Sequence, residues 1–383
     1  MTARWQGLDI GYDIPACPGM KEAEIQTPGL ILDLDVFEAN VAHMRDRAAA
    51  MGVRLRVHGK MHRSADIARY QIASGGAVGI CCQKVSEAEA FVRAGITDVL
   101  ISNEVRDPAK LDRLARLPLL GARILVCVDD PAGIDDLAAA VQRHGTRVEV
   151  LVEMEAGADR CGVAAGQPVV DLARRVASAP GLKFAGIQAY CGPAQHIYDF
   201  AERKARVAAV TEQVRQTLAL LEAAGFACEI VGGAGTGTYG FEGQSGLYTE
   251  LQSGSYAFMD ADYARLKDAS GRPVTEFGHA LFVLTTIMSQ PRPGRAVCDA
   301  GLKALAVDSG LPQIAGRDDL VYLSASDEHG VIGDASGSLR VHDRLRLVPG
   351  HCDPTCNLHD WYVGVRGGIV EQLWPITARG KGF

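Results

Sequence analysis

The chain has 383 residues, of which 39 are basic and 46 are acidic, giving a formal net charge of −7. Hydrophobic residues make up 48%, enough for a large buried core, and the length favours two domains. The acidic balance argues against nonspecific nucleic-acid binding. The sequence has no apolar run of about 20 residues and no hydrophobic signal core near Met1, so neither a membrane span nor secretion is expected.

The ten cysteines do not indicate a disulfide framework. Cys81, Cys82, Cys127, Cys191 and Cys298 lie within apolar, strand-like runs, where reduced cysteine behaves as a small hydrophobic residue. We therefore expect free thiols and a cytoplasmic protein. The sequence contains no CxxC pair, which argues against a cysteine-only zinc site.

Short apolar runs alternate with longer helical patterns from about residue 54 to residue 263. We predict strands over 54–59, 77–82, 98–103, 123–129, 148–155, 184–190, 229–233 and 256–260. We predict helices over 64–74, 86–94, 108–117, 131–142, 168–177, 198–224 and 245–251. Eight such units predict a (β/α)8 TIM-type barrel over residues 28–265. A doubly wound open sheet is the competing fold, and eight units exceed its usual strand number.

The remaining sequence has a different pattern. It contains short β-branched runs at 280–287, 296–300, 320–323, 344–348 and 361–365, separated by glycine-rich turns and without a long helical pattern. We predict a second, mostly β domain formed by residues 1–27 and 266–383. The early run 30–35 is a candidate member of the same sheet.

Lys60 stands at the predicted C-terminal end of the first barrel strand. Residues 54–58 alternate apolar and polar side chains, and Gly59 then permits a turn. Parallel α/β folds build active sites at such strand ends. A desolvated lysine there could form a Schiff base, although a single lysine in a sequence is more often a solvated surface residue.

Two further segments carry candidate binding residues. The glycine- and threonine-rich run 231–238 stands at the end of the seventh predicted strand and suits a phosphate-binding loop, with a flexible turn as the alternative. Arg160 lies between Gly157 and Gly162 after the fifth strand, where it could reach the same end of the barrel. The alternative for Arg160 is a surface salt bridge.

His351 and Asp353 form a candidate metal site in the second domain. If their segment is extended, these side chains project to one side and Cys352 to the other. One imidazole and one carboxylate leave positions open for water and substrate oxygens, as in a catalytic divalent-metal site; a buried capping cluster is the alternative. Together with Lys60, Arg160 and the phosphate-binding loop, this pair suggests pyridoxal phosphate (PLP) in the barrel with a metal beside it.

These motifs resemble those of the D-threonine aldolase / D-3-hydroxyaspartate aldolase family, within the alanine-racemase-like, fold-type III PLP enzymes. The similarity extends almost from end to end. It includes HGKMH at 58–62, CCQKVSE at 81–87, RCGV at 160–163, GSYAFMD at 254–260, DEHG at 327–330 and HCDPT at 351–355. The segments 11–15 and 359–366 look closest to the 3-hydroxyaspartate aldolase branch.

The resemblance implies a homodimeric carbon–carbon lyase that uses PLP and a divalent metal to cleave a D-configured 3-hydroxy amino acid reversibly. The expected substrate is 3-hydroxy-D-aspartate, cleaved to glycine and glyoxylate. A D-threonine aldolase releasing acetaldehyde and a D-serine or 3-hydroxyaspartate dehydratase releasing ammonia are the nearest alternatives. A PLP-carrier barrel and a metal-dependent barrel hydrolase without PLP are more distant ones.

The resemblance also implies roles for individual residues. Lys60 would bind PLP covalently, Arg160 would face the pyridine nitrogen, and His196 would lie near the substrate hydroxyl as a catalytic base. The implied cofactor contacts are Lys60, Gln83, Arg160, Tyr190, Gly233, Thr236, Gly237, Thr238, Gly254, Ser255 and Tyr256.

The implied metal ligands are His351 and Asp353. Related dehydratases carry cysteine two residues after the metal-binding histidine and bind zinc, whereas Asp353 is a hard oxygen ligand that favours Mg²⁺ or Mn²⁺. Ala234 departs from the pattern, because the family usually has glycine in this phosphate-binding loop.

Overall fold

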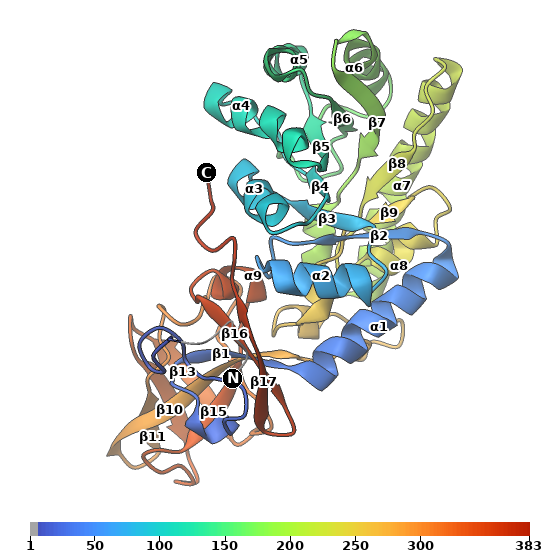
Figure 1. Ribbon diagram of the computed structural model, residues 1–383. Helices are drawn as coiled ribbons and strands as arrows, with labels where there is room; N and C mark the ends of the chain where they lie inside the picture. Colours follow the sequence, from blue (N-terminus) through green and yellow to red (C-terminus); the bar gives the residue numbers. More distant parts are fainter. Residues whose placement is uncertain (1–6) are drawn as a thin grey trace.

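The computed structural model describes residues 7–383, so the predicted assignment of residues 1–6 to the second domain lies outside the described chain. Figure 1 shows an α/β barrel beside a mostly β domain, with the short helix α9 (Cys352–Cys356) at their junction. The division of the chain at residues 28 and 265 stays a prediction. Within residues 7–383, no helix combines the length and hydropathy that a membrane crossing requires.

Eight parallel strands form the closed barrel, which confirms the predicted fold class. They are β2 (Arg54–His58), β3 (Gly79–Cys82), β4 (Asp98–Ile101), β5 (Arg123–Val128), β6 (Val148–Glu153), β7 (Leu182–Gln188), β8 (Ile230–Gly233) and β9 (Glu250–Leu251). Each strand pairs with the next, and β9 pairs with both β8 and β2. The C-terminal ends of all eight strands therefore share one end of the barrel.

The predicted eighth strand over 256–260 and the predicted helix over 245–251 are both wrong. The closing strand is the two-residue β9, which is too short to show a periodicity. The apolar run after it begins as a 3₁₀ helix, η5 (Ser255–Ala257). Phe258 lies outside the barrel wall, 6.1 Å from the ring of Phe37 between centroids, so its hydrophobicity reflects packing against α1 rather than a place in the sheet.

Helices surround the barrel, and six of the predicted ones are present. They are α2 (Ala65–Ala73), α3 (Val85–Arg93), α4 (Pro108–Arg116), α5 (Pro131–His144), α6 (Gln167–Ser178) and α7 (Phe200–Ala223), with the short α8 (Tyr239–Gly243) after β8. The carboxylates of Asp107, Asp130 and Asp199 accept hydrogen bonds from the first turns of α4, α5 and α7. Helix α1 (Leu34–Met51) is not among the predicted helices, although its buried residues recur at helical spacing.

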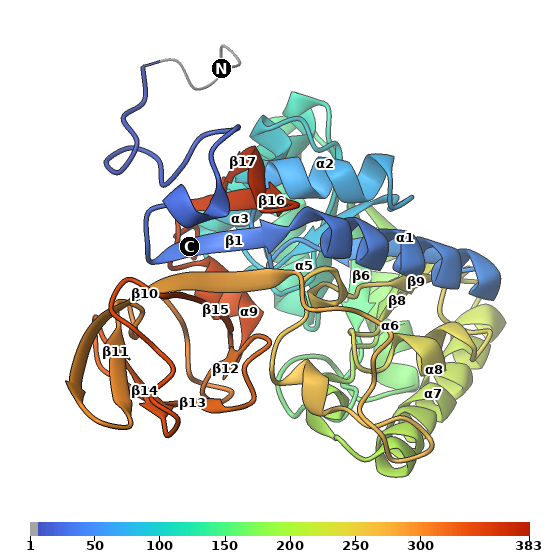
Figure 2. The same cartoon turned by 90° about the horizontal axis from the view of Figure 1, so that it is seen from below.

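A nine-stranded sheet forms the second domain, and the predicted strands in this region are confirmed. Its members are β1 (Gly29–Asp33), β10 (Leu281–Arg292), β11 (Arg295–Cys298), β12 (Gln313–Ile314), β13 (Leu320–Ala325), β14 (Gly330–Asp334), β15 (Arg344–Val348), β16 (Trp361–Arg366) and β17 (Ile369–Pro375). Strand β1 pairs with β10 and β16, as Figure 2 shows, so the early apolar run does belong to this sheet.

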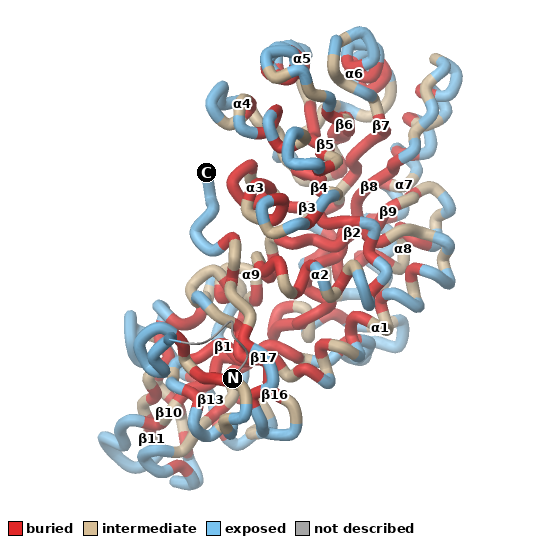
Figure 3. The backbone as a smooth tube through the Cα atoms, viewed as in Figure 1, coloured by how far each residue is buried: buried red, intermediate tan, exposed pale blue. Residues whose placement is uncertain are grey.

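Buried residues follow the barrel strands and continue into the second sheet (Figure 3). Small and medium-sized side chains fill the barrel interior; these are Cys81, Leu100, Leu125, Cys127, Leu151, Ala185 and Ile230. All ten cysteines are free thiols, as the sequence predicts.

A buried ion pair links the closing strand to β2. Arg56 is fully buried, and its Nε donates to Glu250 Oε2 at 2.8 Å while its Nη1 donates to Asp98 Oδ1 at 2.6 Å. Glu250 is itself 1% exposed. The short β9 is thereby held to its neighbour by charge as well as by backbone hydrogen bonds.

We predict that Glu250→Ala lowers the free energy of unfolding by about 3–5 kcal/mol, because it leaves a buried guanidinium without its main partner. Urea denaturation followed by intrinsic fluorescence measures this loss. The control is Glu229→Ala, which removes a half-exposed partner of Arg123 and Lys183. Equal losses in the two variants would show that the buried pair does not stabilise barrel closure.

Candidate active site

A cavity of about 330 Å³ lies at the C-terminal end of the barrel and extends to α9. Its lining residues are His58, Lys60, Met61, Gln83, Ser102, Arg160, Gln188, Tyr190, Gln195, His196, Ala234, Gly235, Thr236, Gln252, Gly254, Ser255, Asp262, Tyr263, His351 and Asp353. Most follow a barrel strand directly, as active-site residues of such barrels do. The second domain supplies the last two.

Most residues singled out in the sequence come together at this cavity. Those that line it are Lys60, Gln83, Arg160, Tyr190, His196, Thr236, Gly254, Ser255, His351 and Asp353. The lining does not include Gly233, Gly237, Thr238 or Tyr256. The Tyr256 hydroxyl, for example, accepts a hydrogen bond from Gln71 Nε2 at 3.1 Å, away from the cavity.

Lys60 projects from the end of β2 towards the second domain. Its Nζ lies 3.9 Å from Asp353 Oδ2. Burial opposes the charge on the amine, but Asp353 and Tyr190 outweigh this effect and raise the pKa of Lys60. The amine of Lys60 in the barrel and the carboxylate of Asp353 in α9 therefore interact electrostatically.

The segment that carries His351 and Asp353 is not extended beyond His351, so the condition for the expected alternation of its side chains is not met. His351 is extended at φ −145° and precedes α9, whereas Asp353 lies in the first turn of that helix. Cys352 is fully buried, and its backbone N–H donates to Asp260 Oδ2 at 2.9 Å. The tight turn nevertheless directs His351 and Asp353 to the same cavity.

The donor set at α9 fits a hard divalent cation. Asp308 Oδ2 lies 2.7 Å from His351 Nδ1, and a carboxylate can only accept, so Nδ1 carries the proton and Nε2 remains available as a ligand. Burial opposes protonation of His351, but Asp353 and Asp308 together raise its pKa. A carboxylate that orients a metal-binding imidazole is a common arrangement around metal sites.

The loop after β8 fits a phosphate group. A Cβ on Gly235 would lie 2.5 Å from the terminal amide of Gln195, so a larger residue there would displace that side chain. Ala234 adopts φ +69°, the left-handed conformation in which glycine is normally favoured. Thr236 presents its hydroxyl at the cavity and accepts a hydrogen bond from the Tyr256 N–H at 2.9 Å. Ala234 therefore adopts a left-handed backbone conformation that glycine normally favours.

Beneath this loop lies the buried carboxyl group of Glu242, which is 1% exposed. Thr238 Oγ1 donates to Glu242 Oε1 at 2.8 Å. Burial raises the pKa of Glu242 from 4.5 to about 7, and the Thr238 hydrogen bond only partly offsets this rise. A protonated Glu242 does not repel a phosphate in the loop above it.

We predict that Glu242 makes stability pH-dependent. Its folded-state pKa is raised, so its contribution is fully present below pH 4.5 and is lost as the pH rises through about 7. Glu242→Gln should therefore lose less unfolding free energy than wild type between pH 5 and pH 8, by a margin of about 2.5 kcal/mol. Denaturant titrations at both pH values measure the difference. The unfolding free energy of the exposed control Glu229→Gln should change with pH as that of wild type does. The same change with pH in all three proteins would contradict the prediction.

Sequence reasoning missed several cavity residues, including Gln188, Gln252 and Asp262. Gln188 is the last residue of β7, and Gln252 follows β9 directly, so their positions at strand ends were an available signal. Each donates its side-chain amide to the other, at 2.7 and 2.8 Å. Asp262 follows no strand and gives no local signal, because only the folded chain brings it to His196.

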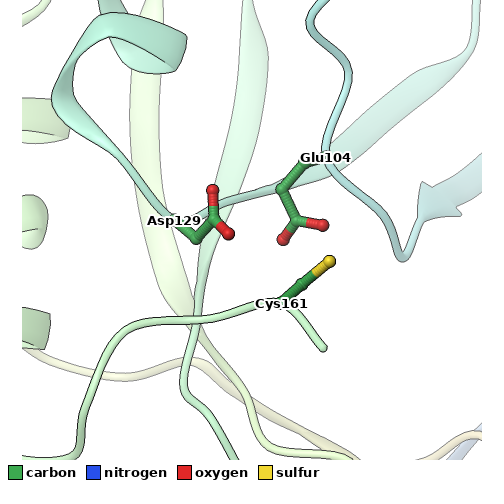
Figure 4. A group of neighbouring side chains, drawn as sticks. All are labelled: Glu104, Asp129 and Cys161. Atoms are coloured by element: carbon green, nitrogen blue, oxygen red, sulfur yellow. The ribbon is translucent and has the colours of Figure 1, made fainter. Parts of the chain in front are cut away.

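A separate group of titratable side chains lies beside Arg160. Figure 4 shows Glu104, Asp129 and Cys161, whose candidate ligand atoms lie within 4.8 Å of one another. Burial, reinforced by Glu104, raises the pKa of Cys161 to about 11 and that of the adjacent Glu153 to about 8. The Cys161 thiol and the Glu153 carboxyl group therefore hold their protons at neutral pH.

Two protein-family models match this chain. The model of the alanine racemase N-terminal domain matches residues 32–262, more than half of the chain, and a serine dehydratase domain model matches residues 280–365. The protein therefore belongs to the alanine racemase N-terminal domain family.

Individual relatives narrow this assignment. The chain is 59% identical over 381 residues to 3-hydroxy-D-aspartate aldolase of Paracoccus denitrificans (strain Pd 1222), covering 99% of this chain and 98% of the relative. It matches the crystal structure of D-threonine aldolase from Filomicrobium marinum with a TM-score of 0.93 and 51% identity, over 96% and 100% of the two chains. A cysteine-to-alanine variant of D-threo-3-hydroxyaspartate dehydratase, in a metal-free form, matches with a TM-score of 0.81 and 27% identity, over 93% and 98%.

Proposed function

We propose that this protein is a PLP- and divalent-metal-dependent aldolase that reversibly cleaves 3-hydroxy-D-aspartate to glycine and glyoxylate. The observation that carries the proposal is that Lys60 of the barrel and the His351–Asp353 pair of the second domain line one cavity. The activities named for the two aldolases described above support the same reaction class. The 59% identity to the 3-hydroxy-D-aspartate enzyme favours the substrate with a second carboxylate.

The barrel residues fit PLP. Lys60 would hold its aldehyde carbon covalently, the loop with Gly235 and Thr236 would hold its phosphate together with Ser255, and Arg160 would face its pyridine nitrogen. PLP, when bound, would supply an electron sink for the electron pair of the bond that breaks. The side chains of the protein would then have to bind and orient PLP and the substrate and to transfer protons.

The residues at α9 fit a metal ion. His351 Nε2 and a carboxylate oxygen of Asp353 would be its protein ligands, and this nitrogen–oxygen set favours Mg²⁺ or Mn²⁺ over zinc. The cation, when bound, would polarise the substrate hydroxyl. The metal-free form named for the dehydratase variant supports a metal site in a protein of this fold.

His196 is the proposed base. It lines the cavity with a side chain that is 58% exposed, so it can contact a substrate hydroxyl. It would accept the hydroxyl proton as the Cα–Cβ bond breaks and the aldehyde forms. Proton return to Cα would then give glycine. We further propose that the protein acts as a cytoplasmic homodimer on small-molecule substrates.

The test is to offer purified protein, with PLP and either Mg²⁺ or Mn²⁺, 3-hydroxy-D-aspartate and D-threonine side by side. We expect glycine plus glyoxylate, with a higher kcat/KM for 3-hydroxy-D-aspartate. A higher kcat/KM for D-threonine would make the protein a D-threonine aldolase instead. Release of ammonia without aldehyde would overturn the aldolase assignment.

Variants in the same assay separate the two parts of the site. Lys60→Ala should lose the visible absorbance of lysine-bound PLP. Asp353→Ala should keep that absorbance but lose aldolase activity. The matched control is Asp360→Ala, an exposed carboxylate close in sequence that pairs with Arg379 and should leave activity unchanged. Full activity of the wild type with a chelator present would remove the metal from the reaction.

A further inference from the structure

His196 and Asp262 form a hydrogen-bonded pair at the edge of the cavity. His196 ends the short 3₁₀ helix η4 (Gly192–His196) after β7, and Asp262 lies just before another, η6 (Tyr263–Arg265). His196 Nδ1 lies 2.8 Å from Asp262 Oδ2. The imidazole is more than half exposed, whereas the carboxylate is 4% exposed, so the carboxylate is the fixed member of the pair.

Other donors hold the Asp262 carboxylate in place. Tyr198 donates its hydroxyl to Oδ1 at 2.7 Å, and Arg265 Nη2 donates to the same oxygen. The Arg265 guanidinium also lies over the Tyr198 ring, 4.7 Å from its centroid. Burial opposes ionisation of Asp262, but these donors and His196 lower its pKa below the ordinary value. The carboxylate is therefore an anion with a fixed orientation.

We propose that Asp262 is a positioning residue for the reaction, because it holds the proton of His196 on Nδ1 and leaves Nε2 unprotonated towards the substrate. A carboxylate only accepts hydrogen bonds, so the imidazole nitrogen that faces it must donate. The other nitrogen is then the acceptor. This inference rests on the proposed function, in which His196 is the base.

The pair can also stabilise the charge that the reaction creates. When Nε2 accepts the hydroxyl proton, the O–H bond breaks and an N–H bond forms. The O–H electron pair becomes the second bond of the aldehyde, and the Cα–Cβ pair departs with Cα. The imidazolium that results lies against the Asp262 anion, so the step separates less charge than with an isolated histidine.

A second histidine–aspartate pair provides a matched control. Asp112 Oδ1 lies 2.6 Å from His144 Nε2 where α4 and α5 pack on the outside of the barrel. This pair has the same chemistry but does not line the cavity. Asp112→Asn should therefore leave the reaction unchanged, whereas Asp262→Asn should impair it.

The kinetic test uses the holoenzyme. Asp262→Asn places an amide donor against Nδ1 and favours the opposite tautomer, so we expect kcat to fall about 100-fold with KM, PLP absorbance and metal affinity unchanged. In a His196→Gln background, Asp262→Asn should change kcat less than about twofold, because the residue acts through His196. Additive losses, an unchanged kcat in the single variant, or a loss that appears only in KM would overturn the proposal.

A second measurement does not depend on activity or on the folding of a variant at position 262. Two-bond ¹H–¹⁵N correlation spectra of ¹⁵N-histidine-labelled wild type show which ring nitrogen is protonated, and His196→Gln assigns the signals. We expect the Nδ1–H tautomer for His196, and the Nε2–H tautomer would overturn the proposal. If no 3-hydroxy amino acid is cleaved, the proposed function fails, whereas the tautomer still decides whether Asp262 positions His196.

Discussion

The buried carboxylate of Asp260 joins the two halves of the site. It is fully buried, accepts the Tyr263 N–H at 2.9 Å through Oδ1, and accepts the Cys352 N–H at 2.9 Å through Oδ2. The neighbouring Ala261 N–H donates to Pro349 at 3.0 Å. Burial raises the pKa of Asp260, but these backbone donors compensate part of the desolvation. Through this contact, the chain that follows the last barrel strand fixes α9, and thereby the distance between Lys60 and Asp353.

The charges of the cavity are organised around this junction. Three imidazoles line the cavity, and two of them have Nδ1 held by a carboxylate: His351 by Asp308 and His196 by Asp262. Arg265 connects these two pairs, since its Nη2 contacts Asp262 and also donates to the backbone oxygen of Ser309 at 3.0 Å. In both cases Nε2 is the nitrogen that remains available. In the proposed function, His351 would use it to bind the metal ion and His196 would use it to accept a proton.

The sequence predicted the parts of this arrangement that depend on local pattern. Seven barrel strands, the β runs of the second domain and the position of Lys60 at a strand end follow from alternation, apolar runs and turn residues. The two-residue β9 did not, because so short a strand has no periodicity and its place depends on pairing with β2 and β8. The HCDPT motif predicts His351 and Asp353 as metal ligands, but it does not predict the helical turn in which Asp353 lies. Asp262 could not be found from sequence, because its role depends on a contact 66 residues away.

The proposed function requires PLP and the metal ion to occupy one cavity. The ³¹P relaxation rate of the phosphate of bound PLP, compared between Mn²⁺ and diamagnetic Mg²⁺, tests this requirement. Because paramagnetic enhancement falls steeply with distance, a shared cavity should give a strong enhancement with Mn²⁺ that disappears in Asp353→Ala. An enhancement no larger than that of Mn²⁺ free in solution, or one unchanged by Asp353→Ala, would contradict the account.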